Sequence, residues 1–201
     1  MRIAAKIRQG RAMNAGSSNV LRAIARRLGG ARSGGLVLAL GCVLAVSPAV
    51  PVSAGGFESG VAAFDRGDYF RAVQHWRPLA ETGNVKAQTA LGLAYYHGQG
   101  VPQDYGEAAV WYRRAAEQGY PYAQGLLGYL YFLGQGVYQD YIEAHLWLNL
   151  AAAGLPQGHE RELVITRRGY VQTLLSPDQL HAVQQRAAEW MPAPPVPEDV
   201  Q

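Results

Sequence analysis

The residues that could most directly do chemistry are two glycine pairs in a segment that occurs twice. YYHGQGVPQDY, residues 95–105, returns as YFLGQGVYQDY at residues 131–141. A Gly-x-Gly loop can hold a phosphate when it follows a strand and opens a helix, where backbone amides point at the anion. Here Gly98 and Gly100 follow an amphipathic helical pattern, and no Gly-Lys-Ser/Thr comes after them. Because a glycine with positive φ commonly ends a helix, we predict structural turns and no nucleotide site.

The other reactive side chains form no recognisable catalytic or metal pattern. None of the five histidines belongs to a His-Glu-x-x-His motif or an i, i+4 pair, and the only cysteine is Cys42. The Gly-x-Ser-x-Gly of serine hydrolases is also missing from the sequence. We expect His75 and His145 to be hydrogen-bonded histidines at the edge of the core. The sequence predicts no metal, no cofactor and no enzyme activity.

A repeat with a period of 36 residues explains the spacing of these residues. The residues that recur at this spacing are Ala87-Gln88, Gly98, Gly100, Asp104, Glu107, Ala108, Trp111 and Ala115-Ala116. A partial copy precedes them, in which Asp68 matches Asp104. His75 stands where the full copies have tryptophan, so we expect the first unit to pack differently.

Each unit is predicted to form two helices. The second helix has apolar residues at i, i+3, i+4, i+7 and i+8, the face that an α-helix buries. These residues are Ala108, Trp111, Tyr112, Ala115 and Ala116. The first helix has a similar face, formed by Ala87, Leu91, Ala94 and Tyr95. Gly92 and Gly128 fall inside first helices at a cost of about 1 kcal/mol against alanine, so we expect close helix crossings there.

Polar residues mark the predicted helix starts. Asp104 can accept from the free amides of the first turn, and Glu107 can reach back to complete a capping box. Asp140 and Glu143 repeat this pair. Farther along, Ser176 begins a Ser-Pro-Asp-Gln cap with proline at the first helical position.

The segment AQTALGLAYYHGQGVPQDYGEAAVWYRRAAEQGYPYAQ resembles the Sel1-like repeat, a relative of the tetratricopeptide repeat with a longer loop between its helices. The small residues, the Gly-x-Gly-Val loop, the aspartate and the tryptophan carry the resemblance over two full copies, residues 87–154. The resemblance implies an all-α fold, a right-handed α-solenoid of helix-turn-helix repeats. It also implies a protein that binds proteins or peptides and organises complexes, without catalysis.

These observations divide the chain into six predicted segments. They are a signal peptide (1–54), a tetratricopeptide-like first repeat (55–86), two Sel1-like repeats (87–122 and 123–158), a C-terminal pair of capping helices (159–190) and a disordered proline-rich tail (191–201). A solenoid needs such a capping pair to cover its open end.

The predicted signal peptide accounts for the basic net charge of +3. Of the 18 Lys and Arg residues, 8 precede residue 54, whereas all 15 Asp and Glu follow it, so residues 55–201 carry −5. An 11-residue apolar run, Leu36–Val46, follows the basic part and is short for the roughly 20 residues of a membrane span. We expect cleavage after Ala54. A retained anchor, a lipoprotein at Cys42 and a start at Met13 stay open as alternatives.

The predicted function is a periplasmic or secreted scaffold that binds a protein or peptide in the groove of the solenoid. It is expected to bind no nucleic acid and not to insert into the membrane after cleavage. The candidate partner-binding residues lie beside the buried face of the first helices: Gln88, Tyr96, Gln124, Tyr129 and Phe132. In the alternative interpretation, Tyr96 and Phe132 pack between neighbouring first helices. The alternative function is a cell-wall-binding accessory or an envelope enzyme. Partner identity, pathway and oligomeric state stay open.

Overall fold

The computed structural model describes residues 56–194, so the predicted signal peptide and residues 195–201 lie outside the described part of the chain. Residues 56–194 form eight helices and no strand. The helices are α2 (Gly56–Asp65), α3 (Tyr69–Glu81), α4 (Val85–His97), α5 (Tyr105–Glu117), α6 (Pro121–Leu133), α7 (Tyr141–Gly154), α8 (His159–Gln172) and α9 (Pro177–Glu189).

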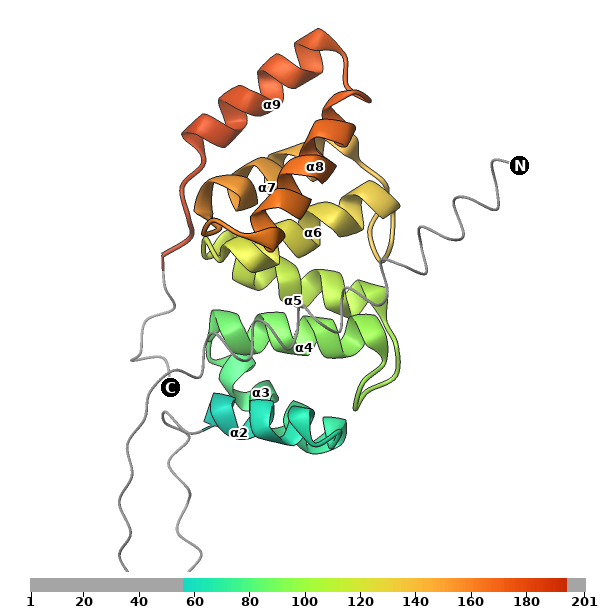
Figure 1. The fold of residues 1–201 in the computed structure, drawn as a ribbon, viewed down its shortest axis with the longest axis vertical. Coiled ribbons are helices and arrows are strands. Elements are labelled where there is room, and N and C mark those ends of the chain that lie inside the picture. The colour runs from blue at the N-terminus through green and yellow to red at the C-terminus, as the bar shows by residue number, and fades with distance from the viewer. Residues whose placement is uncertain (1–55, 195–201) are drawn as a thin grey trace, which may run out of the picture.

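The helices stack in chain order along the long axis of the molecule, from α2 at one end to α9 at the other (Figure 1). Each helix from α2 to α7 packs on the next one, α8 also touches α6, and α9 lies on α7. We call α2, α4, α6 and α8 the first helices and α3, α5, α7 and α9 the second helices. The predicted all-α repeat solenoid is confirmed.

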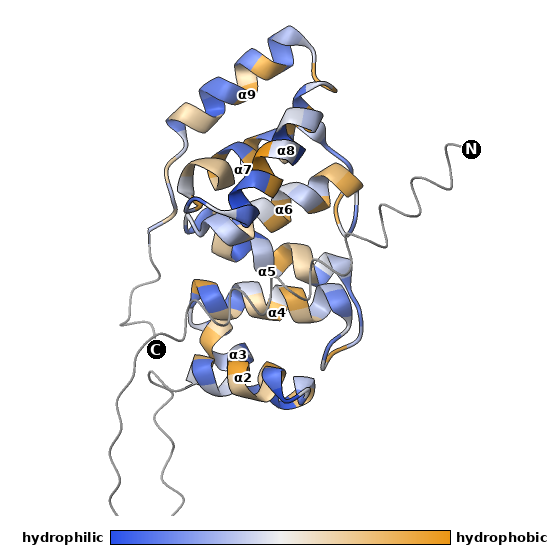
Figure 2. Cartoon of the chain, viewed as in Figure 1, coloured by the Kyte–Doolittle hydropathy of each residue, from blue (hydrophilic) through white to orange (hydrophobic). Residues whose placement is uncertain are grey.

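The predicted apolar faces of the second helices lie in the core, together with buried residues of the first helices. The residues of α5 from Ala108 to Ala116 that were assigned to this face are at most 6% exposed. Figure 2 shows the resulting pattern, in which apolar and polar stretches alternate along the helices of the stack. In the first unit, Trp76 is buried instead, and it covers Gly60 so closely that a Cβ there would collide with its indole ring. The neighbouring His75 is exposed, so its predicted place at the edge of the core is wrong.

The helical glycines lie where helices cross closely, as predicted. A Cβ on Gly92 would lie 2.6 Å from the Tyr112 ring and 3.3 Å from the Ala108 carbonyl oxygen. A Cβ on Gly128 would lie 2.9 Å from the Leu148 side chain. The two sites are one period apart, so the backbones of α4 and α5 and those of α6 and α7 approach each other closely at equivalent positions. The helix pairs therefore need glycine at this position despite its low helix propensity.

The repeated glycine loops are turns. Gly98 ends α4 in the left-handed conformation, with φ 68° and ψ 36°, and Gly100 also has a positive φ of 76°. A Cβ on Gly100 would collide with the Tyr69 carbonyl oxygen at the start of α3, and one on Gly136 would collide with the Tyr105 carbonyl oxygen. Each loop therefore rests on the backbone of the preceding unit, which confirms the prediction of a structural turn.

The helix caps agree with the sequence in part. Asp104 Oδ1 accepts from the amides of Gly106 and Glu107 at 2.8 and 3.0 Å. The predicted return contact from Glu107 to the Asp104 amide is wrong, because that amide already donates to the Tyr95 carbonyl at 3.0 Å. The full capping box occurs only at α9 among the described helices, where Ser176 and Gln179 exchange hydrogen bonds.

The chain after α9 folds back along the second helices. The Trp190 ring packs edge-on against Trp147 of α7, with centroids 6.3 Å apart. Farther on, the Ala193 amide donates to the Glu117 carbonyl at the end of α5, at 2.7 Å. Disorder was expected from residue 191, but residues 191–194 are held by these contacts. They lie along α7 and α5 because the apolar tryptophan anchors the segment that leads to them.

Candidate functional site

The first helices bring four aromatic side chains together. They are Tyr96 of α4, Tyr129 and Phe132 of α6, and Tyr170 of α8, and we call them the aromatic surface. The Tyr129 and Phe132 rings are stacked with centroids 6.4 Å apart. The Tyr170 ring meets Phe132 edge-on at 5.7 Å. Tyr96 lies close enough to Tyr129 and Arg167 for both to influence its pKa, so three successive units contribute to one surface.

The rings of the aromatic surface are partly exposed and partly fixed by packing. Tyr96, Tyr129 and Phe132 are half-buried, and Tyr170 is 58% exposed. The ring centroids of Tyr96 and Tyr105 are 5.1 Å apart. The equivalent pair in the next unit, Phe132 and Tyr141, has its centroids 6.2 Å apart. These repeated pairs join a first helix to the start of the second helix that follows it. The rings therefore contribute to packing and are still partly exposed.

Two of the predicted site residues are buried and do not reach the surface. Gln88 and Gln124 are 3% and 2% exposed. The Gln88 side-chain amide donates to the Ala80 carbonyl at 3.0 Å, and the Gln124 amide donates to the Ala116 carbonyl at 3.2 Å. Each glutamine thus donates to a carbonyl at the end of the preceding second helix, which also accepts from the amide of Gly83 or Gly119, and the buried side-chain amide is satisfied in this way. The assignment of these two residues to partner binding is wrong.

Two residues of α8 belong to the site and were missed by the sequence reasoning. Tyr170 closes one side of the aromatic surface, and the Arg167 guanidinium carbon lies 4.2 Å from the centroid of the Tyr129 ring. This distance is within the range of a cation–π interaction. Helix α8 begins at His159, 38 residues after the start of α6 at Pro121, whereas the 36-residue period would place its start at residue 157. The period could therefore not assign the faces of α8. The amphipathic pattern of α8 was the only available signal.

The electrostatics of the site follow from its burial. Burial is the main cause that raises the pKa of Tyr96 to about 12, and Tyr129 and Tyr105 add to it, so its phenol is neutral at pH 7. Burial also lowers the pKa of Arg167, whereas Tyr129 and Tyr96 act in the opposite direction. The guanidinium stays a cation at pH 7. Within residues 56–194 it forms no ion pair, and its Nε has no hydrogen-bond partner.

Other arginines near the first helices have structural partners. Arg77 donates to the Tyr95 hydroxyl at 3.1 Å, and Arg113 donates to the Tyr131 hydroxyl. These pairs are one period apart and connect a second helix to the next first helix. Arg168, which neighbours Arg167, donates to Asn149 Oδ1 of α7 at 2.9 Å. These arginines stabilise helix contacts.

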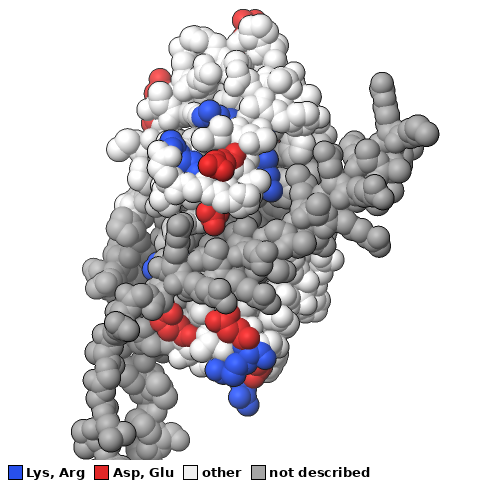
Figure 3. Space-filling model, viewed as in Figure 1, with Lys and Arg blue, Asp and Glu red and all other residues white. Residues whose placement is uncertain are grey.

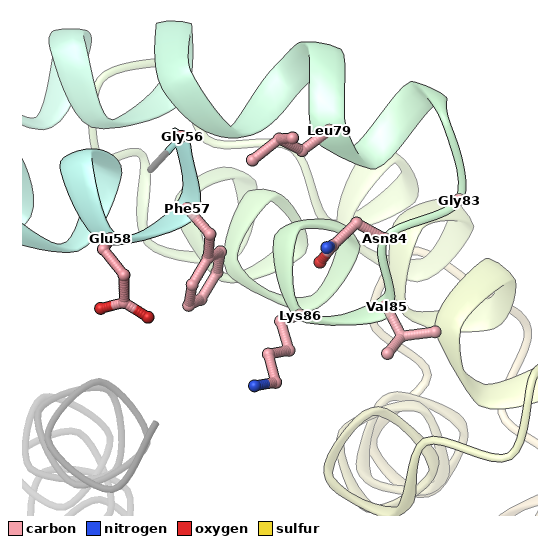
Figure 4. Close-up of a pocket in the computed structure, with 8 residues that line it drawn as sticks. All are labelled: Gly56, Phe57, Glu58, Leu79, Gly83, Asn84, Val85 and Lys86. Atoms are coloured by element: carbon pink, nitrogen blue, oxygen red, sulfur yellow. The ribbon is translucent and has the colours of Figure 1, made fainter. Parts of the chain in front are cut away.

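A separate hollow of about 450 Å³ lies at the end of the solenoid formed by α2, α3 and α4. Figure 4 shows its lining: Gly56, Phe57, Glu58, Leu79, Gly83, Asn84, Val85 and Lys86. The Asn84 side chain already caps α4 by accepting from the Ala87 amide at 3.0 Å. Only Glu58 and Lys86 carry a charge in this lining, so the hollow presents little chemistry for recognition.

The described residues contain no candidate metal site. Between residues 56 and 194, no three His, Cys, Asp or Glu side chains gather closely enough to hold a metal ion. His145 is 2% exposed, and burial, followed by the charge of Arg168, lowers its pKa. Its Nδ1 has no hydrogen-bond partner among the described residues, so it is buried but lacks the predicted bond at this atom. No helix in the described range has the length and apolar character to span a membrane.

Charged side chains occupy a limited part of the face shown in Figure 3. Much of the described surface there carries neither Lys, Arg, Asp nor Glu, and both signs occur where charges are visible. The candidate site is therefore an aromatic surface, presented by consecutive first helices, with one arginine that has no ion pair in the described part of the chain. Together, the fold and this surface define an α-solenoid of repeated helix pairs.

Comparison with known proteins identifies the kind of solenoid. The model of the Sel1 repeat matches residues 85–120 and 121–154. A Sel1 repeat protein from Oxalobacter formigenes has a similar crystal structure, with 35% sequence identity and a TM-score of 0.50, over 59% of this chain and 88% of that one. The chain belongs to the Sel1 repeat family.

A second solved structure covers more of the chain. It is c5321, a protective antigen present in uropathogenic Escherichia coli strains and displaying an SLR fold, with 30% sequence identity and a TM-score of 0.62. The similarity covers 71% of this chain but 31% of c5321, so the chain spans about a third of that protein. The search among curated proteins found no match.

Proposed function

We propose that this protein is an exported interaction scaffold that binds a peptide or protein segment on the aromatic surface. The observation that carries the proposal is the alignment of rings from α4, α6 and α8, with Tyr170 58% exposed at one side. A segment that crosses three first helices contacts three of the four described helix pairs of the solenoid, which is how repeat proteins form extended binding surfaces.

The chemistry of the rings favours a peptide with apolar side chains. Tyrosine and phenylalanine offer a large contact area with few rotatable bonds, and aromatic pairs add about 0.5–1.5 kcal/mol beyond area burial. Packing of Tyr96 on Tyr105 and of Phe132 on Tyr141 orients the rings before a partner arrives. Binding then costs little side-chain entropy, because the rings are already ordered.

Export is the second part of the proposal. Its support is the order of residues 1–54, in which a basic segment precedes an 11-residue apolar run and small residues. N-terminal sequencing of protein from the envelope fraction tests this part, with a start at Gly55 as the expected result. A retained Arg22–Arg32 segment contradicts cleavage.

Site-specific photo-crosslinking tests the binding surface in the native cell. A photoreactive phenylalanine analogue replaces Tyr170, and a control chain carries it at Tyr138, which is 97% exposed in the loop between α6 and α7. The expected result is a discrete crosslinked partner from position 170 and none from position 138. The same partner from both positions, or from position 138 alone, contradicts binding on the aromatic surface.

A further inference from the structure

Arg167 differs from the arginines around it because it has no acceptor among the described residues. On the same helix, Arg161 donates to the Ala152 carbonyl at 2.9 Å, and Arg168 donates to Asn149 at 2.9 Å. On α9, Arg186 pairs with Glu143 at 2.7 Å. Arg167 instead lies over the Tyr129 ring, and within residues 56–194 it has no ion pair and no partner for Nε.

An arginine without an acceptor is unfavourable when it loses water. The Tyr129 ring covers one face of the Arg167 guanidinium, and Tyr96 lies close enough to influence its charge. A cation–π contact compensates only part of the lost hydration. A carboxylate would supply the missing charge-assisted hydrogen bonds, and the planar guanidinium matches its two oxygens.

We propose that Arg167 binds the side-chain carboxylate of an Asp or Glu in the partner segment, between apolar residues that contact the rings. This inference rests on the proposed function of the aromatic surface. The guanidinium lies over α6, so the rings of α4 and α8 lie on either side of it along the solenoid. A carboxylate within the segment, with apolar neighbours on both sides, fits this order better than one at a chain end.

Selection from a random dodecapeptide library displayed on phage tests the proposal and requires no identified partner. The library is selected on the full chain, on Arg167→Gln and on Arg168→Gln. The last variant loses the same charge one residue away, at a side chain that faces α7. Peptides enriched on the wild type are expected to contain Asp or Glu beside aromatic or aliphatic residues. The Arg168→Gln protein is expected to select the same pattern, and Arg167→Gln is expected to lose the acidic residue.

Affinity measurements on the best enriched peptide then isolate the contact. Arg167→Gln, or replacement of the peptide's acidic residue by its amide, is expected to weaken binding about tenfold or more. The two changes together should weaken it no further, because they remove the same interaction. Circular dichroism melts of Arg167→Gln and Arg168→Gln check that both proteins stay folded.

The outcomes separate the inference from the function on which it rests. If no peptide is enriched on the wild type, the proposed function fails. If enriched peptides lack acidic residues, or if Arg167→Gln binds them equally well, only the carboxylate inference is overturned. If the peptides bind as free acids and not as C-terminal amides, the carboxylate belongs to a chain end, and the proposed source is wrong.

Discussion

The contact between each glycine loop and the preceding unit predicts a graded effect of three alanine substitutions. Gly67, Gly98 and Gly100 all have positive φ, at 81°, 68° and 76°. Alanine in this conformation costs about 1–2 kcal/mol at each site. The sites differ in the space around the added methyl group, so the series separates backbone strain from steric collision.

The expected magnitudes follow from that space. A Cβ on Gly67 meets nothing within 4 Å, so Gly67→Ala should lower the free energy of unfolding by about 1 kcal/mol. A Cβ on Gly98 meets Gln103 Cβ at 3.2 Å, which a small shift relieves. A Cβ on Gly100 collides with the backbone of Tyr69, and overpacking adds about 1–3 kcal/mol, for a total of about 2–5 kcal/mol.

Urea unfolding followed by circular dichroism at 222 nm measures these differences, with thermal melts as a second probe. The account predicts the order Gly67→Ala, Gly98→Ala, Gly100→Ala from least to most destabilised. Equal losses for Gly67→Ala and Gly100→Ala would mean that the loop does not rest on the preceding unit. The reasoning about inter-unit contact would then be refuted.

Three further effects should be measurable by the same unfolding assays. Gln124→Ala should cost about 0.5–1.5 kcal/mol, because it removes a buried hydrogen bond to the Ala116 carbonyl, which keeps the Gly119 amide as a donor at 3.0 Å; an unchanged free energy of unfolding would contradict the buried hydrogen bond. Burial lowers the folded-state pKa of His145. The stability that its neutral side chain contributes is therefore fully present above the unfolded-state pKa of about 6.5 and is lost as the pH falls below that value. The free energy of unfolding should therefore fall less between pH 7 and pH 5 in His145→Gln than in the wild type. His97, whose pKa is also lowered by burial, contributes to the fall that is left in the variant. Equal pH dependence of the two proteins would contradict this prediction. Trp190→Ala should cost about 1–2 kcal/mol through its lost contact with Trp147, and an unchanged melting temperature would show that the segment after α9 is not anchored.

The fold could be predicted from the sequence because its determinants are local and repeated. Small residues such as Ala108 and Ala144 recur with the tryptophans at helical spacing, and Asp104 and Asp140 mark the helix starts. The left-handed conformation of Gly98 also follows from its place after an amphipathic helix. Each of these features depends on its own unit, and the duplication makes the signal visible twice.

The errors concern contacts between units, which the local pattern does not specify. Gln88 and Gln124 lie beside the buried face in sequence, but their amides turn inward to carbonyls of the preceding helix. Glu143 was expected to cap its own helix, yet it accepts from Trp147 Nε1 at 3.1 Å and from Arg186. A partner 43 residues away, such as Arg186, leaves no signal in the spacing of one helix.

The candidate site could be predicted only where the period holds. Tyr96 and Phe132 are one period apart, and both lie on the aromatic surface. Arg167 and Tyr170 belong to α8, where the period changes, so the repeat could not assign their faces, which follow from the packing of α8 on α6 and α7. The chemistry of the site, a cation among rings with no ion pair within residues 56–194, thus depends on the part of the solenoid that the repeat does not describe.

Hydrogen–deuterium exchange with a bound peptide tests the central claim most directly. The full chain is compared free and saturated with the best peptide from the library, and protection is read along the helices by mass spectrometry. The account predicts added protection in α4, α6 and α8, with little change in α5. Protection confined to the second helices α5 and α7, or to the hollow between α2 and α4, would contradict binding on the aromatic surface.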